Sequence, residues 1–344
     1  MTATLFKRHS IARATWEEIM IRGKDIAEMV GVSRQAVTAV LNGSRPNCVS
    51  KEKREAILRI ASEHNYHPNY AAKALKTGKS NIVGVVMPPW GNPYIAELCM
   101  AMQQALAAKG YTAFFTVDNN YNPVPGNLEQ LLSLPLAGVI TVASMLLPDN
   151  INVPVVSYFH DDPRFDSVCP DAELNSAVCI DYLKKCGHRK IGYLGMKRGS
   201  KFKFLNRDAL NCGLEFHERW QIDHLYASEE DTFSKLLKCN RNQDLPTALI
   251  IHNDVLALKV IRSIYEHGYR VPEDFSIIGH DNIPCSQSMV PALTTMSYGT
   301  PVEIVGPMVE LLIKQIKNPA SPRQKIILKP ELIERETVFD LTKN

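Results

Sequence analysis

A regular alternation of strand-like and helix-like segments from Asn81 onwards constrains the fold of this chain more than any other feature. Apolar runs typical of buried strands, such as 82–87 (IVGVVM) and 137–143 (AGVITVA), are separated by amphipathic stretches such as 93–110. This alternation favours parallel sheets with helices on both faces. About 260 residues with roughly ten such runs predict two sheets side by side. Ligands bind such folds at the carboxyl ends of the strands, here in a cleft between two lobes.

The other expected elements continue this rhythm. Strands are expected at 111–118, 153–159, 190–196, 222–228, 247–254 and 275–282. Helices are expected at 127–134, 174–187, 206–220, 231–240 and 255–268.

A different pattern, two short amphipathic segments joined by a tight turn, occupies residues 24–43. Gly31 allows the turn between them, Ser33 is a good N-cap for the second segment, and Asn42-Gly43 ends it. The apolar faces have helical spacing and consist of Ile26, Ala27, Val30, Ala36, Val37, Val40 and Leu41. This pattern predicts a helix-turn-helix whose second helix lies in the major groove. The alternative is an ordinary helical hairpin.

Two further segments complete the N-terminal region. A third helix is expected over 51–65, with Ser50 as its cap, which makes a minimal three-helix DNA-binding head. The short basic stretch 66–80 is too short to form a stable helix alone. It is either a segment that orders against DNA or a plain linker.

Charge is distributed unevenly along the 344 residues. Residues 1–80 hold 14 Lys and Arg against 7 Asp and Glu, a net charge of +7, and the remainder holds 25 against 29, a net charge of −4. A basic head on a mildly acidic body fits a head that meets phosphate, although a solvated basic surface is the alternative.

The composition narrows the class of protein further. The eight cysteines contain no C-x-x-C pair and the ten histidines lack ligand spacing, so we expect reduced thiols and no metal site. We find no phosphate loop and no G-x-S-x-G, and therefore expect neither an enzyme nor a cofactor. No apolar run approaches the roughly 20 residues that cross a bilayer, and no signal peptide is evident, which favours a cytoplasmic protein.

Several segments, in order, resemble the lactose/galactose repressor (LacI/GalR) family of bacterial transcription regulators. They are DIAEMVGVSRQAVTAVLNG, NYHPNYAAKALKTGKSNIVGVV, CGHRKIGYLG, HGYRVPEDFSIIGHDNIPCSQSMVPALTTM and KPELIERETV. The resemblance runs with gaps from about residue 22 to 338. It implies an α/β protein with an all-helical helix-turn-helix head, a hinge helix and a two-lobed core like that of periplasmic sugar-binding proteins.

The resemblance also implies which residues meet DNA. The reading-helix contacts would be Ser33, Arg34, Gln35, Thr38, Ala39 and Asn42. Arg pairs bidentately with guanine and Gln with adenine, whereas Ala39 replaces a base-reading Arg of many relatives and should alter the operator preference. In the hinge helix, Leu75 would wedge into the minor groove at the operator centre, with Asn69 and Ala72 beside it. A second departure is Arg22-Gly23, where relatives have a Thr-containing entry.

For the effector, the resemblance carries over residues at strand ends. They are Trp90, Asn92, Tyr94, Arg207, Asn253 and Asp281. A carboxylate, an amide and a guanidinium together with aromatic rings suit the hydroxyls and faces of a sugar. The alternative for each polar residue is a helix cap or strand-end hydrogen bond, which we favour for Asp254. His280 stands where relatives have an aromatic residue, and Leu210 where they have glycine.

These observations predict an effector-controlled repressor that binds a palindromic operator as a homodimer, without a membrane partner. The expected segments are an N-terminal extension (1–21), the DNA-binding domain (22–66), the hinge and linker (67–80), the effector-binding core (81–338) and a tail (339–344). A solute-binding protein without DNA function is the alternative for the core.

Overall fold

The computed structural model divides into two compact units, residues 1–80 and 81–344. We call the first unit the head and the second the core. The structure describes residues 21–41, 48–66, 80–88, 91–117, 127–142, 147–148, 150–196, 200–223, 231–240 and 244–343.

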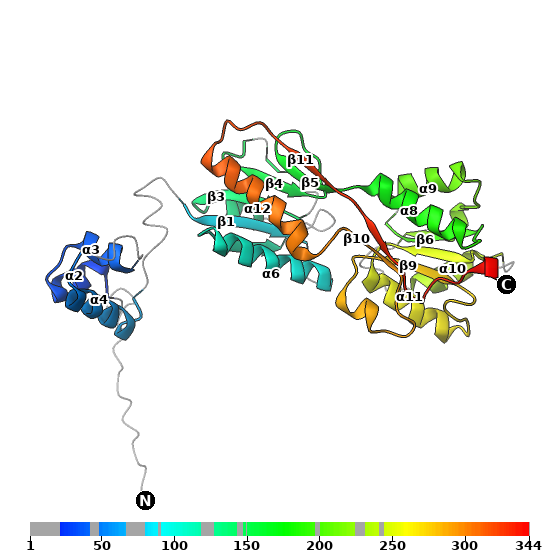
Figure 1. Ribbon diagram of the computed structural model, residues 1–344, viewed down its shortest axis with the longest axis horizontal. Coiled ribbons are helices and arrows are strands. Elements are labelled where there is room, and N and C mark those ends of the chain that lie inside the picture. Colours follow the sequence, from blue (N-terminus) through cyan, green and yellow to red (C-terminus); the bar gives the residue numbers. More distant parts are fainter. Residues whose placement is uncertain are drawn as a thin grey trace, which may run out of the picture. The chain divides into compact units, whose positions relative to one another are not determined.

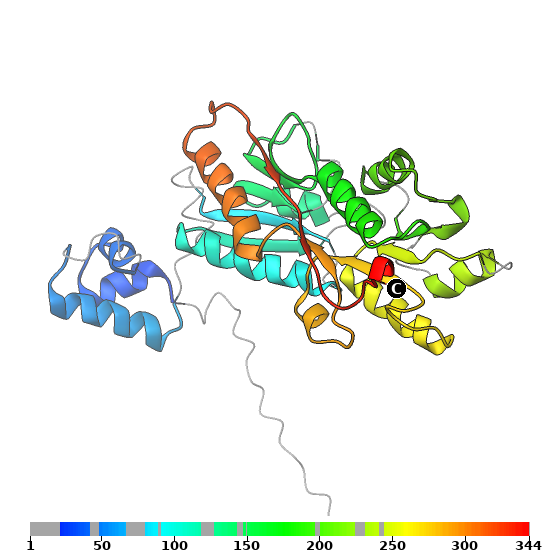
Figure 2. The ribbon, with the colours of Figure 1, turned by 45° about the vertical axis from the view of Figure 1, so that its right-hand side comes forward.

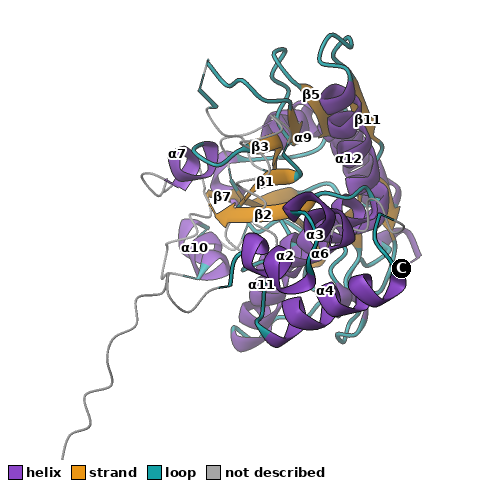
Figure 3. Cartoon of the chain, turned by 90° about the vertical axis from the view of Figure 1, so that its left-hand side faces the viewer, coloured by secondary structure: helices purple, strands orange, loops and turns teal. Residues whose placement is uncertain are grey.

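The described part of the head consists of three helices, labelled in Figure 3. They pack around one small apolar cluster. They are α2 (Gly23–Val30), α3 (Arg34–Leu41) and α4 (Lys51–Glu63). Of the expected apolar residues, four are buried, whereas Val30, Ala36 and Leu41 are only partly buried. The buried members of the cluster are Ile26, Ala27, Val37, Val40, Ile57 and Ala61. Because each helix is too short to be stable alone, this shared cluster holds the head together.

Local signals in the sequence fix the turns between these helices. Gly31 has a φ of +66°, a left-handed conformation that glycine adopts without strain. The Ser33 hydroxyl accepts a hydrogen bond from the Ala36 amide at 3.2 Å, and the Ser50 hydroxyl caps α4 in the same way. Glycine at position 23 avoids a steric clash, because a Cβ there would lie 2.6 Å from the Tyr66 hydroxyl oxygen.

The core contains two six-stranded sheets, which confirms the predicted α/β class. In the first, the strands run in the order β11 (Lys325–Leu328), β5 (Asp166–Pro170), β4 (Val155–Tyr158), β3 (Leu136–Thr141), β1 (Ile82–Met87), β2 (Thr112–Val117). In the second, the order is β12 (Glu331–Ile333), β10 (Thr295–Ser297), β9 (Ser276–His280), β8 (Ala248–Ile251), β6 (Ile191–Gly195), β7 (Gln221–Asp223). The strand pairs are parallel except β10–β12, which is antiparallel.

Helices cover both faces of each sheet (Figures 1 and 2). Lobe 1 is the first sheet with α6 (Pro93–Ala108), α7 (Asn127–Leu132) and α12 (Pro301–Lys317). Lobe 2 is the second sheet with α8 (Ala172–Lys185), α9 (Ser200–Asn211), α10 (Thr232–Cys239) and α11 (Asp254–Glu266). Strands buried on both faces read as continuous apolar runs, which is why they stood out in the sequence.

The chain crosses between the lobes at three described places: 170–172, 297–301 and 328–331. The third is visible as the long red segment in Figure 2. Each lobe is therefore built from separated stretches of sequence. Because the strands are parallel, the loops after β1, β4 and β9 lie at the carboxyl edges of their sheets.

The structure corrects some predicted elements. The helix expected over 206–220 is α9, which begins at Ser200 and ends at Asn211. Gly213, with a φ of +68°, turns the chain, and Glu215 then forms a parallel bridge with Lys190. Twelve strands are assigned in the described residues rather than roughly ten. The additional elements include β5, β10 and β11, whose short or partly exposed runs gave no strong pattern.

Candidate functional sites

The exposed side chains around the start of α3 form the candidate DNA-reading surface. Ser33, Arg34 and Gln35 are exposed, while Val37 and Val40 of the same helix are buried against α2 and α4. The helix therefore presents a guanidinium and a carboxamide to solvent from a fixed scaffold. These are the groups that pair with the edges of guanine and adenine.

Two other predicted DNA contacts on α3, Thr38 and Ala39, are less available to bind a partner. The Thr38 hydroxyl donates to the Arg34 carbonyl oxygen at 3.0 Å, so its proton is engaged within the helix. Ala39 is half-buried. The remaining predicted contacts lie outside the described residues: Asn42, Asn69, Ala72 and Leu75 of the DNA-binding set, and Trp90 of the effector set.

Helix α4 adds positive charge to the head. Its exposed cations are Lys51, Lys53, Arg54 and Arg59. Lys53 Nζ also donates to the Gly31 carbonyl oxygen at 3.1 Å, which ties α4 to the turn that precedes α3. The same helix carries the exposed carboxylates Glu52, Glu55 and Glu63, so its net charge is 4 − 3 = +1. Lys53 also braces the turn.

In the core, a polar cluster joins the two lobes. We call Asn92, Tyr94, Tyr158, Lys201 and Asp281 the interlobe cluster. Asn92 caps α6 in lobe 1, where its side-chain oxygen accepts from the Tyr94 amide at 3.1 Å. Its Nδ2 donates to Asp281 Oδ2 at 2.8 Å, and Asp281 follows β9 in lobe 2. The structure therefore brings together three predicted effector residues: Asn92, Tyr94 and Asp281.

The aromatic side of this cluster is a pair of buried tyrosines. The hydroxyl oxygens of Tyr94 and Tyr158 lie 2.6 Å apart, a short hydrogen bond between α6 and the end of β4. Burial raises the pKa of both phenols, and the Asp281 carboxylate raises them further. The tyrosines are therefore neutral near pH 7. Tyr158 was not identified from the sequence, because its role depends on how the end of β4 packs against α6.

Lys201, at the start of α9, supplies the positive charge of the cluster. Its Nζ donates to the His252 carbonyl oxygen at 2.9 Å. Burial lowers the pKa of Lys201 and raises the pKa of Asp281, while each charge partly offsets the effect on the other. No ion pair within 4.0 Å joins these two groups among the described contacts, so each keeps hydrogen-bonding capacity for a third group.

Two predicted effector residues lie apart from this arrangement. Arg207 is exposed and pairs with Glu173 and Asp208, each at 2.8 Å. Asn253 is buried and caps α11, where its oxygen accepts from the Leu256 amide at 2.9 Å. The structure gives both residues structural partners instead of a place in the interlobe cluster.

The residues around β9 hold the Asp281 backbone in place. Asp254 is fully buried and accepts from the Thr295 hydroxyl at 2.6 Å and the Ile283 amide at 3.0 Å, and burial raises its pKa to about 7. His280 is also buried, and a ring nitrogen donates to the Ile251 carbonyl oxygen at 2.8 Å. These contacts make Asp254 and His280 supports of the strand end.

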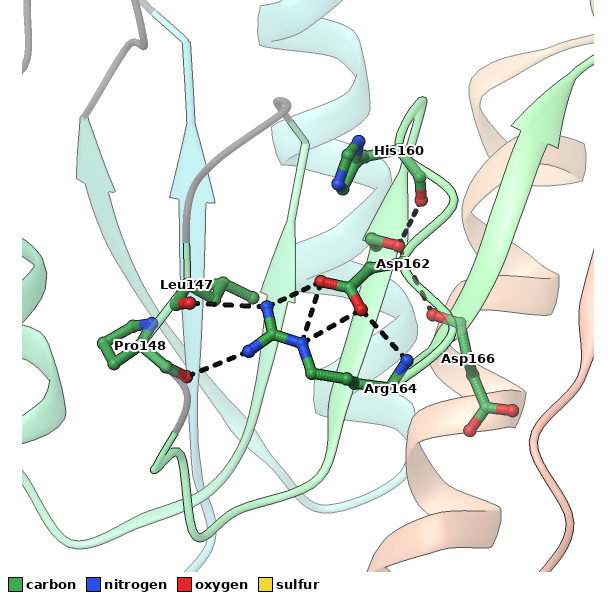
Figure 4. Close-up of polar contacts among 7 residues, drawn as sticks. Leu147, Pro148, His160, Asp162, Arg164 and Asp166 are labelled. Atoms are coloured by element: carbon green, nitrogen blue, oxygen red, sulfur yellow. Dashed lines mark hydrogen bonds and ion pairs between the residues drawn. The ribbon is translucent and has the colours of Figure 1, made fainter.

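An arginine orders the loop that follows β4 (Figure 4). Arg164 Nε lies 3.0 and 3.1 Å from the two carboxylate oxygens of Asp162, and its terminal nitrogens donate to the carbonyl oxygens of Leu147 and Pro148. Arg164 lowers the pKa of Asp162 to about 2. The loops after β3 and β4 are thereby connected at the carboxyl edge of lobe 1.

No helix in the described part of the chain is long and apolar enough to span a membrane. Within the same described residues, no group of three or more His, Cys, Asp or Glu side chains could hold a metal ion.

Both the head and the core match known protein families. Residues 24–69 match the family described as "Bacterial regulatory proteins, lacI family", and residues 180–338 match "Periplasmic binding protein-like domain". Similar curated proteins are named HTH-type transcriptional repressor PurR. The one from Pasteurella multocida is 29% identical over 92% of this chain and 98% of its own length. That from Mannheimia succiniciproducens is 27% identical over the same shares.

Solved structures show the same fold. The lac repressor dimer, bound to operator and the anti-inducer ONPF, superposes with a TM-score of 0.77 at 22% identity, covering 93% of this chain and 99% of that one. A transcriptional regulator CelR in complex with cellobiose gives 0.65 at 21% identity, covering 92% and 99%. The chain therefore carries a DNA-binding domain of the type described as lacI family ahead of a periplasmic-binding-protein-like core, and it is similar over 92% of its length to proteins named as repressors.

Proposed function

We propose that this protein is an effector-responsive, sequence-specific DNA-binding repressor that acts in the cytoplasm and is not an enzyme. The observation that carries the proposal is the exposed Ser33-Arg34-Gln35 edge of α3 on a packed three-helix head. The match of residues 24–69 to the lacI family, the similarity to proteins named as repressors and the net charge of +7 on residues 1–80 support it. We assign residues 22–66 to DNA reading, 67–80 to the hinge and linker, and 81–338 to effector binding.

The DNA experiment is selection of binding sites from random duplexes by the full-length chain. We expect a palindromic consensus, since two heads of a dimer would read two half-sites about one helical turn apart. Affinity for the selected site should fall steeply as salt rises. Recovery of no consensus, or binding that does not respond to salt, would contradict the proposed reading surface.

We infer that a small-molecule effector, a sugar or a sugar derivative, binds at the interlobe cluster. Asp281 offers acceptors, Lys201 offers donors, and Asn92 and the tyrosines add further polar groups beside aromatic rings. This combination suits a carbohydrate. A carbohydrate effector agrees with the cellobiose bound to CelR and with the ribose bound to a LacI family transcriptional regulator from Enterococcus faecium. The structure of the Enterococcus faecium regulator has a TM-score of 0.65 at 20% identity and covers 76% of this chain and 99% of its own.

The effector would act by changing the angle between the lobes. The Asn92–Asp281 hydrogen bond links a helix cap in lobe 1 to a strand end in lobe 2, so a ligand that replaces or extends it changes the relative stability of lobe arrangements. We propose that the hinge, with Asn69, Ala72 and Leu75, transmits this change to the heads. Effector and operator would then influence each other's affinity by the same factor.

A thermal-shift screen of the full-length chain tests effector binding. Sugars, sugar phosphates and nucleobases form the panel, and a compound at 100 times its dissociation constant adds about 2.7 kcal/mol of stability. Asp281→Ala should remove the shift produced by a true effector while operator binding persists. A shift that survives this substitution would place the compound elsewhere.

We further propose that the protein is a homodimer, as is the lac repressor in its operator complex. Helix α6 leaves Met100 64% exposed, an apolar side chain suited to a subunit contact. Sedimentation analysis should show a dimer for the full-length chain and a shift toward monomer for Met100→Glu. A monomer that still binds a palindromic site with high affinity would contradict this assignment.

A further inference from the structure

The turn between α2 and α3 contains a backbone carbonyl that is bound by a lysine of the third helix. The Gly31 amide donates to the Glu28 carbonyl oxygen at 3.3 Å, which helps to close the end of α2. The Gly31 carbonyl oxygen has one hydrogen-bond donor among the described residues, Lys53 Nζ at 3.1 Å. Because Gly31 has no side chain of its own, this bond ties the turn to α4.

Lys53 occupies a position where a cation does not stabilise its own helix. It is the third residue of α4, and its amide donates to the Ser50 hydroxyl that caps the helix. The amino end of a helix carries a partial positive charge, so a lysine there is less favourable than an acidic residue. The ammonium of Lys53 therefore contributes nothing to α4, whereas it supplies a charged donor to the turn before α3.

This hydrogen bond lies close to the residues that begin the reading helix. Ser33 lies two residues after Gly31, and its hydroxyl caps α3. The buried side chains of α3 are Val37 and Val40, which lie beyond its first three residues. The direction of the first turn of α3 therefore depends on the turn that Lys53 holds.

Base reading is sensitive to this direction. The exposed side chains of Arg34 and Gln35 have no hydrogen-bond partner in the described part of the chain, so their positions depend on the backbone of α3. A bidentate contact with a base needs two nearly linear hydrogen bonds at once. Phosphate contacts carry no sequence information. A small rotation of the start of α3 would thus lower base discrimination more than total affinity.

We propose that Lys53 is a positioning residue for base recognition. Its ammonium holds the Gly31 carbonyl oxygen and thereby fixes the direction of the first turn of α3, so its charge is used inside the protein and not on phosphate. Lys53 then determines specificity through Arg34 and Gln35 without touching DNA. This inference rests on the proposed DNA-binding function and adds a specificity-determining residue outside the reading helix.

Two methionine variants of the full-length chain test the proposal. Lys53→Met removes the ammonium and keeps most of the length of the side chain. Lys51→Met is the matched control, because Lys51 is an exposed lysine in the same helical turn and has no polar contact among the described residues. Fluorescence anisotropy measures the affinity of each variant for the selected operator and for duplexes altered at single base pairs. The ratio of these two affinities is the discrimination ratio.

The expected effect is a loss of discrimination. Lys53→Met should lower the discrimination ratio by about fivefold or more at the base pair where wild type discriminates best, since one bidentate contact supplies at least this much. Lys51→Met should leave the ratio unchanged. The slope of log affinity against log salt should be the same for Lys53→Met and wild type, whereas removal of a phosphate contact would reduce it by about 1.

The discrimination ratio separates positioning from a loss of stability. A partly unfolded head binds every duplex more weakly by the same factor, which is the fraction of folded heads. This factor cancels when one affinity is divided by the other. A residue that only stabilises the head would therefore change both affinities and leave their ratio as it is.

Two results would overturn the inference alone, while the proposed DNA-binding function stands. One is a discrimination ratio for Lys53→Met equal to that of wild type, whatever the change in affinity. A salt slope reduced by about 1 would then make Lys53 a phosphate contact. The other is an equal loss of discrimination in Lys51→Met, which would make the effect one of charge. If the wild-type chain does not discriminate between duplexes, the proposed DNA-binding function fails and the inference fails with it.

Discussion

The reading surface of the head and the interlobe cluster of the core are built in opposite ways. On α3, Arg34 and Gln35 are exposed and come from one short stretch of sequence. In the cluster, Asn92 and Asp281 are half-buried, bonded to each other and 189 residues apart. The first arrangement leaves donors and acceptors open to a large partner, whereas the second encloses a few groups whose pKa values burial has shifted.

The comparison implies that the head can fail without the core. Ile57 is fully buried where α4 meets the other two helices. Ile57→Ala should cost about 2–5 kcal/mol, which is comparable with the stability of a small helical domain. We expect loss of operator binding and an unfolded head.

Calorimetry of the full-length chain checks this prediction. The transition that belongs to the core should keep its midpoint, and a probe that stabilises the core should still do so. A core transition that moves together with the head would show that the two units unfold as one.

This contrast also explains what could be predicted from the sequence. The helices of the head follow from local spacing, a glycine turn and serine caps, all within about 45 residues. In the core, Asn92, Tyr94 and Asp281 were predicted because the motifs that contain them resemble those of the family; the structure places Asn92 and Tyr94 at the start of α6 and Asp281 after β9. Lys201 and Tyr158 did not, because their positions depend on how separated segments pack.

Arg207 shows why the bounds of a helix matter for assigning a site. The predicted helix began at residue 206, whereas α9 begins at Ser200 and includes both Lys201 and Arg207. Six residues along an α-helix correspond to about 240° of rotation, so these two side chains leave the helix on different faces. Lys201 therefore meets the cluster while Arg207 pairs with Glu173.

The next largest effect is expected from the exposed surface. Arg34→Ala should weaken binding to the selected operator by about 1–3 kcal/mol and relax the preference at one base pair. Arg59→Ala, which removes an exposed arginine from α4, controls for charge. Fluorescence anisotropy with single-base variants of the operator measures the affinity and the base preference of both protein variants. If Arg34→Ala weakens all sequences equally, Arg34 contacts phosphate instead of a base.

Effector affinity at the interlobe cluster should depend on pH, whereas DNA affinity at the reading surface should not. Burial holds the pKa of Asp281 above that of an exposed Asp, about 4, and the ionised carboxylate is the form that accepts a hydrogen bond from the effector. Burial also lowers the pKa of Lys201 to about 8, so affinity is full between this value and the raised pKa of Asp281. It falls as the pH drops through the Asp281 pKa, by up to about tenfold per pH unit.

Thermal-shift titrations of a stabilising probe between pH 8 and pH 5 follow this loss. Asp281→Asn removes the titrating group, so its weaker affinity should vary less with pH. A profile of the same shape in wild type and Asp281→Asn would assign the titration to another group.

The smallest effect is expected at Thr38, which lies on the reading helix but has its proton engaged. A hydroxyl must donate its proton to bond a phosphate oxygen, and the Thr38 proton is directed to the Arg34 carbonyl oxygen at 3.0 Å. Thr38→Val keeps the shape and removes the hydroxyl. We expect operator affinity to change by less than about 0.5 kcal/mol, the range of ordinary surface substitutions.

Anisotropy titration measures the operator affinity of Thr38→Val. Arg34→Ala, titrated in parallel, shows how large the loss is when a base contact is removed. A loss of 1 kcal/mol or more, equal on all sequences, would show that the hydroxyl leaves the helix carbonyl and bonds phosphate when DNA is bound.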